Sequence, residues 1–268
     1  MSAVRVAIAG AGGRMGRSLL EAATSTDGVA LAAALDVATS PAAGQDAGVL
    51  APGAKGVRVG SDVAAALAAC DVLVDFTRPE GTVAHLAACR AAKRAMVIGT
   101  TGFGAAQLEA IRAAAREIPI VMAPNMSVGV NVALKLVETA SRALGPDYDI
   151  EVFEVHHRMK VDAPSGTALK LGEAAAAARG TALEKAAVFA RHGTTGERRP
   201  GSIGFSVARA GDIVGDHTVL FAGPGERLEI THRSSSRATY AQGAMRAAKF
   251  VAGRPPGLYD MRDVLGLG

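Results

Sequence analysis

The chain has no tryptophan and few other aromatic residues. Only 4% of its 268 residues are aromatic, namely three tyrosines and seven phenylalanines. Because proteins that bind single-stranded nucleic acid stack the bases on aromatic side chains, this scarcity argues against a nucleic-acid partner. The formal net charge of +4 comes from basic residues scattered along the chain, a distribution that suits a small anionic ligand.

Cysteines and long apolar runs are scarce as well. Cys70 and Cys89 are the only cysteines, too few for the disulfide framework of a small secreted protein, and we interpret them as reduced thiols. No uninterrupted apolar run reaches the length of about 18 residues that a membrane-spanning helix needs. The N-terminal residues also lack the basic and apolar regions of a secretion signal. These absences predict a cytoplasmic protein with no membrane partner.

Short β-rich runs alternate with longer alanine-rich helical stretches up to Asn125. Such alternation predicts an α/β fold with an N-terminal Rossmann-type doubly wound parallel sheet, whose ligand lies beyond the carboxyl ends of the strands. The expected strands are Val4–Ala9, Val29–Leu35, Asp71–Phe76, Ala95–Ile98 and Pro119–Met122, and the expected helices are Arg14–Ala23, Asp62–Ala69, Glu80–Lys93 and Ala105–Arg116.

After Asn125 several strands follow one another without helices between them. This order predicts a second α+β domain with an open antiparallel or mixed sheet. Its expected helices are Val130–Leu144 and Thr167–Ala178, and its expected strands are Ile150–His157, Ala187–Arg191, Ile203–Ala208, Thr218–Ala222 and Leu228–His232. A last helix, Arg237–Val251, is expected to return to the first domain. We therefore expect one domain at residues 1–127 with 237–268, and a second at residues 128–236.

A glycine-rich loop, Gly10-Ala11-Gly12-Gly13-Arg14-Met15-Gly16, lies between the first strand and the first helix. The usual three-glycine fingerprint would have glycine where Met15 stands, but the register Gly10, Gly13, Gly16 is complete. Glycines let the backbone approach a pyrophosphate, whose charge meets the helix N-terminus. Asp36 ends the second strand, where it can accept hydrogen bonds from the adenosine ribose. Together they predict a dinucleotide site.

The residue after Asp36 bears on the choice of cofactor. A 2′-phosphate would favour arginine or lysine there, and the chain has Val37, so the sequence leans toward NADH rather than NADPH, although Arg14 could still contact a phosphate. Two further loops follow strand ends on the same edge, Gly99-Thr100-Thr101-Gly102 and Ala123-Pro124-Asn125-Met126. Their position makes them candidates for the nicotinamide half, and plain turn chemistry is the alternative.

The segment from Glu154 to Leu169 concentrates chemical groups. His156, His157, Arg158 and Lys160 lie within five positions at the end of an apolar strand, where histidine can deliver a proton and lysine a fixed charge. Ser165 is expected to cap the helix that follows, and the backbone amides of Gly166 and Thr167 at its N-terminus would bind a carboxylate. The segment suits a small dicarboxylate, and a solvated basic loop is the alternative.

The histidines do not suggest a metal. Neighbouring residues on a strand point to opposite faces, so His156 and His157 cannot easily share one ion. The other four histidines have no ligand spacing, and we interpret most of them as surface or core residues; they are His85, His192, His217 and His232.

These motifs together resemble the 4-hydroxy-tetrahydrodipicolinate reductase family, also called dihydrodipicolinate reductase, over nearly the whole chain. The matching segments are Val6 to Gly16, Val74-Asp75-Phe76-Thr77, Gly99 to Gly102, Ala123 to Ser127, His156 to Leu169, Arg209 to Gly215 and Glu226 to His232. The resemblance implies reduction of the dehydrated 4-hydroxy intermediate to tetrahydrodipicolinate in lysine and diaminopimelate biosynthesis. It also implies a homotetramer joined through the sheet of the second domain, which binds the substrate.

The resemblance assigns roles to residues. It implies that His156 and Lys160 are the proton-donating pair and that His157, Gly166 and Thr167 contact the substrate. The implied contacts of the NADH or NADPH cofactor are Gly10, Ala11, Gly12, Gly13, Arg14, Met15, Asp36, Gly99, Thr100, Thr101, Ala123, Pro124, Asn125 and Met126. Val37 departs from the dual-cofactor pattern, because some members carry arginine at that position.

Two other functions remain open from the sequence. One is another small-acid dehydrogenase on the same architecture, although neither cysteine has the setting of a catalytic thiol. The other is a dinucleotide-sensing regulator that kept the fold and lost the chemistry. The presence of both His156 and Lys160 argues against a sensor, which needs neither.

Overall fold

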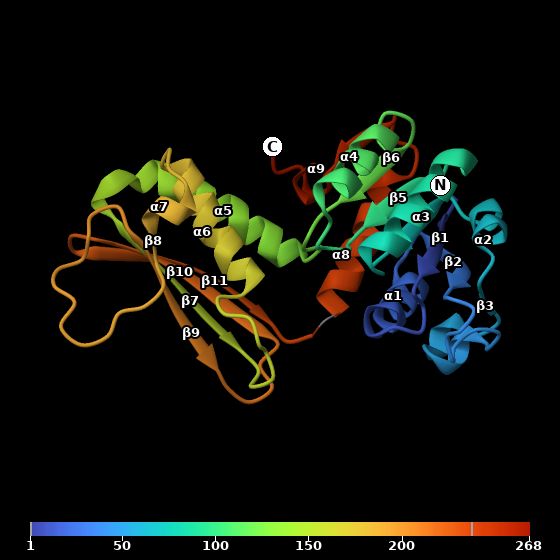
Figure 1. Ribbon diagram of the computed structural model, residues 1–268, viewed down its shortest axis with the longest axis horizontal. Helices are drawn as coiled ribbons and strands as arrows, with labels where there is room; N and C mark the ends of the chain where they lie inside the picture. Colours follow the sequence, from blue (N-terminus) through green and yellow to red (C-terminus); the bar gives the residue numbers. More distant parts are fainter. Residues whose placement is uncertain (1, 237) are drawn as a thin grey trace. The chain divides into compact units, whose positions relative to one another are not determined.

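The computed structural model describes residues 2–236 and 238–268, which form two compact units (Figure 1). The first unit comprises Met1–Val128 and Arg237–Gly268, and the second comprises Gly129–Ser236. The second unit is therefore an insertion in the sequence of the first. The last long helix, α8, is Ala238–Val251; Arg237, where we expected it to begin, lies outside the described residues.

The first unit contains a parallel sheet in the order β12-β6-β5-β4-β1-β2-β3. This is the doubly wound order, in which the chain starts in the middle, moves to one edge and then crosses to the other side of β1. The strands are β1 (Val4–Ala9), β2 (Val29–Leu35), β3 (Val59–Gly60), β4 (Val72–Asp75), β5 (Ala95–Ile98), β6 (Pro119–Met122) and β12 (Gly257–Tyr259). Its switch point lies between β1 and β4, where a ligand crevice is expected.

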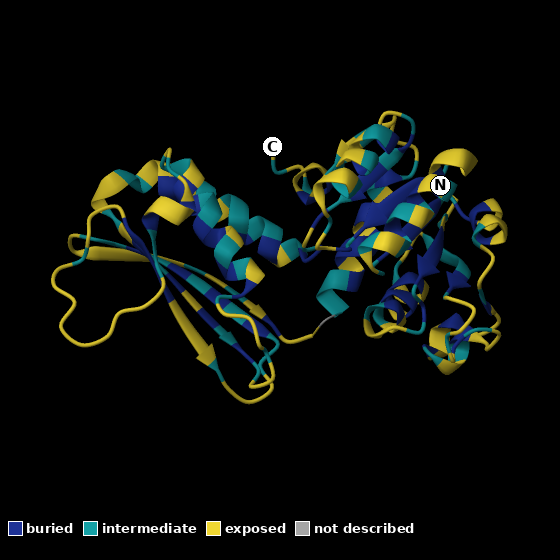
Figure 2. Cartoon of the chain, viewed as in Figure 1, coloured by how far each residue is buried: buried dark blue, intermediate teal, exposed yellow. Residues whose placement is uncertain are grey.

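Helices cover both faces of this sheet because successive strand residues point to opposite sides. Val6 and Ile8 pack in one apolar cluster with residues of α1 and α8, whereas Ala7 and Ala9 pack in a second cluster with residues of α2, α3 and α4. The helices are α1 (Arg14–Ser25), α2 (Val63–Ala69), α3 (Pro79–Ala92), α4 (Ala105–Ala114) and α9 (Met261–Leu265), with short 3₁₀ turns at Ala47–Val49 and Pro52–Ala54. Figure 2 shows the central strands of the sheet buried between them, with every residue of β4 and β5 buried, whereas β2 is mostly half-buried.

The two cysteines are free and buried in the second of these clusters, as expected for reduced thiols. Burial raises the pKa of the Cys70 thiol to about 11, and it raises the pKa of the Cys89 thiol further. Neither thiol is therefore a nucleophile near neutral pH. Within residues 2–236 and 238–268 no helix has the length and apolar character to cross a membrane.

The second unit contains a mixed sheet in the order β11-β10-β7-β9-β8, with β7 parallel to β9 and antiparallel to β10. Its strands are β7 (Asp149–His156), β8 (Ala187–Val188), β9 (Ile203–Arg209), β10 (Gly215–Gly223) and β11 (Glu226–Ser234). The helices α5 (Val128–Leu144), α6 (Gly166–Ala178) and α7 (Leu183–Ala186) pack against one face, over a core that includes Val152, Phe205 and Phe221 (Figure 1). The predicted fold class is confirmed.

Some expected elements differ from those observed. The strand expected at Ala187–Arg191 is wrong beyond Val188, because β8 pairs with β9 over two residues only and Phe189 is 56% exposed. The sequence analysis also missed β3, β12, α7 and α9. These elements have two to five residues each. Such lengths are too short to display a period of either kind.

Candidate functional site

The glycine loop makes a tight turn from β1 into α1. Gly10 has a φ of +71°, a conformation that favours glycine, and its carbonyl accepts a hydrogen bond from the Gly13 amide at 3.0 Å. A Cβ at Gly16 would overlap that same carbonyl oxygen. Gly13 caps α1 with no side-chain hydrogen bond, so the first amides of the helix have no side-chain cap and can meet an anion. The register Gly10, Gly13, Gly16 thus has a steric reason.

Asp36 lies against this loop from the end of β2. Its Oδ2 accepts a hydrogen bond from the Gly12 amide at 2.8 Å, and its Oδ1 accepts one from the Val37 amide at 2.8 Å. A Cβ at Gly12 would lie 2.6 Å from Oδ2, so glycine at this position lets the carboxylate reach the loop. Val37 beside it is 65% exposed.

A pocket of about 850 Å³ lies at the switch point of the first unit. It is lined by Gly10, Gly13, Arg14, Met15, Gly16, Asp36 and Val37, and by Phe76, Thr77, Arg78, Glu80 and Gly81 from the loop after β4 and the start of α3. The second group was not among the predicted cofactor residues. The signal that could have found it is the position of β4, the strand that lies on the other side of the switch point.

A buried acid supports the loop after β4. Asp75 is fully buried and accepts hydrogen bonds from the Thr77 amide at 2.8 Å, the Thr82 hydroxyl at 3.1 Å and, at its other oxygen, His85 Nδ1 at 2.6 Å. Burial opposes the ionised form, but the hydrogen bonds from His85 and Thr77 hold the pKa of this carboxyl below its usual range. The Thr82 and Thr100 hydroxyls are hydrogen-bonded to each other at 2.8 Å, which ties the loop after β5 to the same network.

The other predicted cofactor residues do not line the 850 Å³ pocket; they are Ala11, Gly12, Gly99, Thr100, Thr101, Ala123, Pro124, Asn125 and Met126. Met126 is buried in the core of the unit, and a Cβ at Gly243 of α8 would overlap its carbonyl oxygen. Thr101 and Pro124, by contrast, are exposed at the carboxyl ends of β5 and β6. Both loops end at the expected edge of the sheet, since these strands are parallel neighbours.

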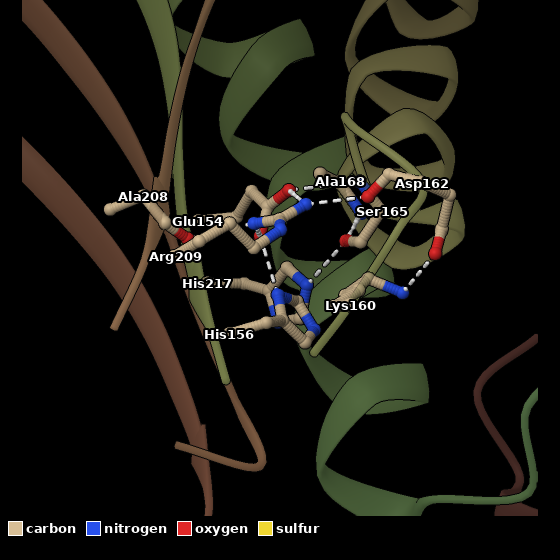
Figure 3. A network of polar contacts seen from close by, with 9 residues as sticks. All are labelled: Glu154, His156, Lys160, Asp162, Ser165, Ala168, Ala208, Arg209 and His217. Carbon is tan, nitrogen blue, oxygen red and sulfur yellow. Dashed lines mark hydrogen bonds and ion pairs between the residues drawn. The ribbon is translucent and has the colours of Figure 1, made fainter. Parts of the chain in front are cut away.

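In the second unit a buried carboxylate gathers the groups at the end of β7 (Figure 3). Glu154 is 2% exposed, and each of its oxygens accepts a hydrogen bond from Arg209 at 2.9 Å. Its Oε1 also accepts a hydrogen bond from the Ser165 amide at 3.0 Å, and its Oε2 is hydrogen-bonded to His156 Nδ1. Burial disfavours the ionised form, but Arg209 and His156 hold the pKa of Glu154 below its usual range.

Ser165 caps helix α6, as the sequence predicted. Its hydroxyl oxygen accepts a hydrogen bond from the Ala168 amide at 3.1 Å and is hydrogen-bonded to His217 Nε2 at 2.9 Å. Gly166 is exposed and Thr167 half-buried, so this helix N-terminus is accessible to a ligand. The predicted site residues at the end of β7 and at the start of α6 are thus brought together.

His217 was missed as a site residue, since nothing in the spacing separates it from an ordinary core histidine. It lies on β10 with its ring edge-on to His156, at 5.0 Å between centroids. Burial, and next electrostatic repulsion from the neighbouring His156 imidazole, lower the pKa of His217 to about 4. His217 is therefore neutral at pH 7. A Cβ at Gly215 on the same strand would lie 2.9 Å from His156 Nε2, so the residue under this ring must be small.

Lys160 lies on the loop between β7 and α6, and its Nζ donates to Asp162 at 2.8 Å. That hydrogen bond lowers the pKa of the Asp162 carboxyl. The lysine side chain is 20% exposed, so it can meet a ligand as well. Over residues 2–236 and 238–268 no group of three or more His, Cys, Asp or Glu side chains could hold a metal ion.

Comparisons with known proteins find relatives that match both units of the chain. Family models for the N-terminus and the C-terminus of dihydrodipicolinate reductase match residues 4–126 and 129–265. A 4-hydroxy-tetrahydrodipicolinate reductase of Cupriavidus necator is 62% identical over 264 residues, covering 98% of this chain and 100% of the relative. The 4-hydroxy-tetrahydrodipicolinate reductase of Laribacter hongkongensis is 61% identical over 267 residues, covering 100% of this chain and 100% of the relative.

Solved structures agree with these sequence matches. The dipicolinate-bound dihydrodipicolinate reductase from Paenisporosarcina sp. TG-14 superposes with a TM-score of 0.78 at 25% identity, covering 97% of this chain and 98% of that one. GenD2 from gentamicin A biosynthesis, solved with NAD, has a TM-score of 0.60 at 18% identity and covers 100% and 91%, a likeness of fold alone.

Proposed function

This chain belongs to the dihydrodipicolinate reductase family, and from that premise we propose that it reduces 4-hydroxy-tetrahydrodipicolinate to tetrahydrodipicolinate. It is an oxidoreductase, and the reaction is a step of lysine and diaminopimelate biosynthesis. The observation that carries the proposal is the cluster in which buried Glu154 joins His156 to the N-terminus of α6. Such a cluster places a proton donor, His156, next to backbone amides that can bind a carboxylate of the substrate.

The residues of the first unit fit a nicotinamide dinucleotide. The glycine turn, the N-terminus of α1 without a side-chain cap, and Asp36 match the pyrophosphate and the adenosine ribose of such a cofactor. A reduced nicotinamide supplies the hydride when bound. We assign the Gly99 to Thr101 and Ala123 to Met126 loops to the nicotinamide half, because they end at the same edge of the sheet as the 850 Å³ pocket.

We expect NADH to be used at least as well as NADPH. Asp36 presents a carboxylate where a 2′-phosphate would lie, and Val37 supplies no compensating charge. Arg14 and Arg78 line the same pocket and supply the positive charge that a 2′-phosphate needs. The ratio of kcat/KM with NADH to kcat/KM with NADPH measures whether repulsion by Asp36 or attraction by Arg14 and Arg78 dominates. Val37→Arg is expected to raise kcat/KM with NADPH by roughly tenfold through one added charge-assisted contact.

The second unit binds the substrate and supplies the proton. Water leaves the 4-hydroxy substrate, a hydride adds to the conjugated ring that remains, and one proton balances the reduction. We assign this proton to His156 with Lys160, and we assign the substrate carboxylates to His157 and to the amides of Gly166 and Thr167.

The open face of the mixed sheet supports the proposed homotetramer. Phe153, Val155 and Leu220 alternate with buried residues and therefore lie on the face opposite the helices, where Phe153 is 39% exposed. Glu151 and Thr218 alternate onto the same face, so it combines apolar and polar side chains, as an interface between subunits commonly does. Light scattering of the purified protein gives the oligomeric state, and a monomer would contradict this assignment. The cytoplasmic location stays a prediction.

The decisive experiment mixes the purified chain with NADH, or with NADPH in parallel, and freshly prepared 4-hydroxy-tetrahydrodipicolinate. Loss of reduced-nicotinamide absorbance that depends on the substrate supports the proposal, and His156→Gln is expected to lower kcat by roughly a hundredfold without changing NADH affinity. If the folded protein binds NADH but oxidises none, it is a sensor or acts on another small acid, and the proposal is wrong.

A further inference from the structure

We propose that Glu154 is the positioning residue of this enzyme: its carboxylate orients His156 through Nδ1 and at the same time fixes the start of α6. The inference rests on the proposed function, because it gives His156 the role of proton donor. The sequence analysis gave Glu154 no role, and its partners come from three separate elements.

Burial and geometry show why this carboxylate is specialised. Glu154 and His156 are two positions apart on β7, so their side chains lie on the same face of the sheet. A carboxylate that is 2% exposed is costly unless its oxygens are fully paired. Arg209 donates to both oxygens of Glu154. The Ser165 amide is hydrogen-bonded to one of these oxygens and His156 to the other, at the lone pairs that Arg209 leaves. Every acceptor direction of Glu154 is thus committed to holding a neighbour.

This pairing determines the tautomer of His156. The pKa of Glu154 is held below its usual range, so the carboxyl is ionised and only accepts hydrogen bonds. Nδ1 of His156 must therefore carry a hydrogen and donate it. Nε2 is left as the nitrogen that exchanges a proton with the substrate. It lies over Gly215, where the absence of a side chain keeps this nitrogen uncovered.

The charges around His156 leave Glu154 with a distinct role. Glu154 faces the imidazole from β7, Arg209 from β9 and His217 from β10, while Lys160 lies on the following loop. His217 is neutral at pH 7, and Arg209 is engaged with Glu154 and with the Asp162 carbonyl at 2.6 Å. Glu154 therefore supplies the negative charge that stabilises a protonated His156.

The same carboxylate sets the position of the helix that binds the substrate. The Ser165 amide donates to Glu154, and Ser165 is the residue immediately before the amides of Gly166 and Thr167. Ser165 is also bonded to His217, whose ring packs edge-on against His156. These contacts join Glu154, Ser165, His217 and His156 in a ring. The ring holds His156 at a fixed position relative to the amides that bind the substrate carboxylate, as effective proton transfer requires.

The test compares Glu154→Gln with the matched control Glu151→Gln. Glu151 is on the same strand and pairs with Arg191 at 2.9 and 3.0 Å and with Arg198, whereas its carboxylate makes no hydrogen bond to His156. Glu154→Gln is expected to lower kcat by roughly tenfold to a hundredfold with NADH affinity unchanged. KM is expected to change less than about threefold, because the side-chain oxygen of glutamine can still accept the hydrogen bond from the Ser165 amide that fixes the start of α6. The alkaline limb of the kcat profile moves to lower pH, because protonated His156 loses its facing anion. Glu151→Gln changes kcat less than about twofold.

A double-mutant cycle separates positioning from a general structural role. In a His156→Gln background, adding Glu154→Gln is expected to cost less than about a further twofold in kcat, because the group that Glu154 orients is gone. An equal multiplicative loss in both backgrounds overturns the proposal. So does a lowered kcat with an unmoved pH profile.

A spectroscopic measurement keeps the proposal testable if Glu154→Gln does not fold. In wild-type protein labelled with ¹⁵N-histidine, and assigned by the His156→Gln spectrum, neutral His156 is expected as the Nδ1–H tautomer. The Nε2–H tautomer overturns the proposal. This measurement needs no turnover, so it distinguishes a wrong tautomer from a wrong reaction: inactive wild-type enzyme with the Nδ1–H tautomer refutes the function alone.

Discussion

His217 gives the second unit a specific weakness to acid. The residue is 5% exposed, and burial lowers its pKa to about 4 from an ordinary 6.5. Between these values the unfolded chain binds a proton that the folded chain does not. Because the state that binds more protons gains as pH falls, the free energy of unfolding must decrease as pH drops from about 6.5 to about 4.

The size of this effect follows from the gap between the two pKa values. Two and a half pH units correspond to about 3 kcal/mol when the full range is crossed, and to about 2 kcal/mol at pH 5. That is a large share of the stability of an ordinary domain, about 5–15 kcal/mol. His217→Gln removes the titrating group and retains an amide that can reach the Ser165 hydroxyl, so this acid dependence should disappear with it.

Hydrogen exchange followed by mass spectrometry measures the effect where it arises. Peptides from β7 and β10 are compared at pH 7.5 and pH 5.0, at one protein concentration and with exchange rates corrected for pH. The stability advantage of wild type over His217→Gln is expected to shrink by about 2 kcal/mol at the lower pH. The control is His192→Gln, an exposed histidine, which should follow wild type. Equal acid dependence in wild type and His217→Gln would refute the argument.

Three further substitutions test other parts of the structure. Gly16→Ala places a methyl group on the Gly10 carbonyl and should weaken NADH binding at least about tenfold by fluorescence titration, whereas Gly60→Ala, with open space around it, should not. Gly215→Ala should lower kcat by roughly tenfold in the absorbance assay with unchanged NADH affinity, because the methyl group crowds His156 Nε2; a fully active variant would show that this nitrogen is not used. Asp75→Asn breaks a fully buried network at a cost of about 3 kcal/mol and should lower the melting temperature by roughly 5–10 °C in calorimetry; an unchanged temperature would mean that the network adds no stability.

The repetitive part of the fold could be predicted from the sequence, and its short elements could not. The strands that begin at Val4, Val29 and Ala95 are apolar runs between helical stretches, and the doubly wound sheet follows from their alternation. By contrast β3 and β12 are strands only because a neighbouring strand supplies their hydrogen bonds. Their existence depends on tertiary contacts that a local pattern does not contain.

The candidate site divides in the same way. Gly10, Gly16 and Asp36 could be predicted because the loop and the following strand end bear a fixed sequence relation to each other. Glu154 could not be assigned a role, since Ser165 and Arg209 are 11 and 55 positions away, and only the fold brings them together. The catalytic histidine could be identified because it lies in a dense sequence segment, whereas the role of Glu154 follows only from its contacts in the folded protein.

The insertion of the second unit into the first has a consequence for synthesis. Helix α8, which packs in one core with α1, and strand β12, which pairs with β6, both come after residue 236. A ribosome therefore makes the whole second unit before it makes the residues that complete the first. Because domains fold as units while the chain is still growing, the middle of this protein can fold first. The beginning of the chain must wait, with one edge of its sheet unpaired, until the end of the chain arrives.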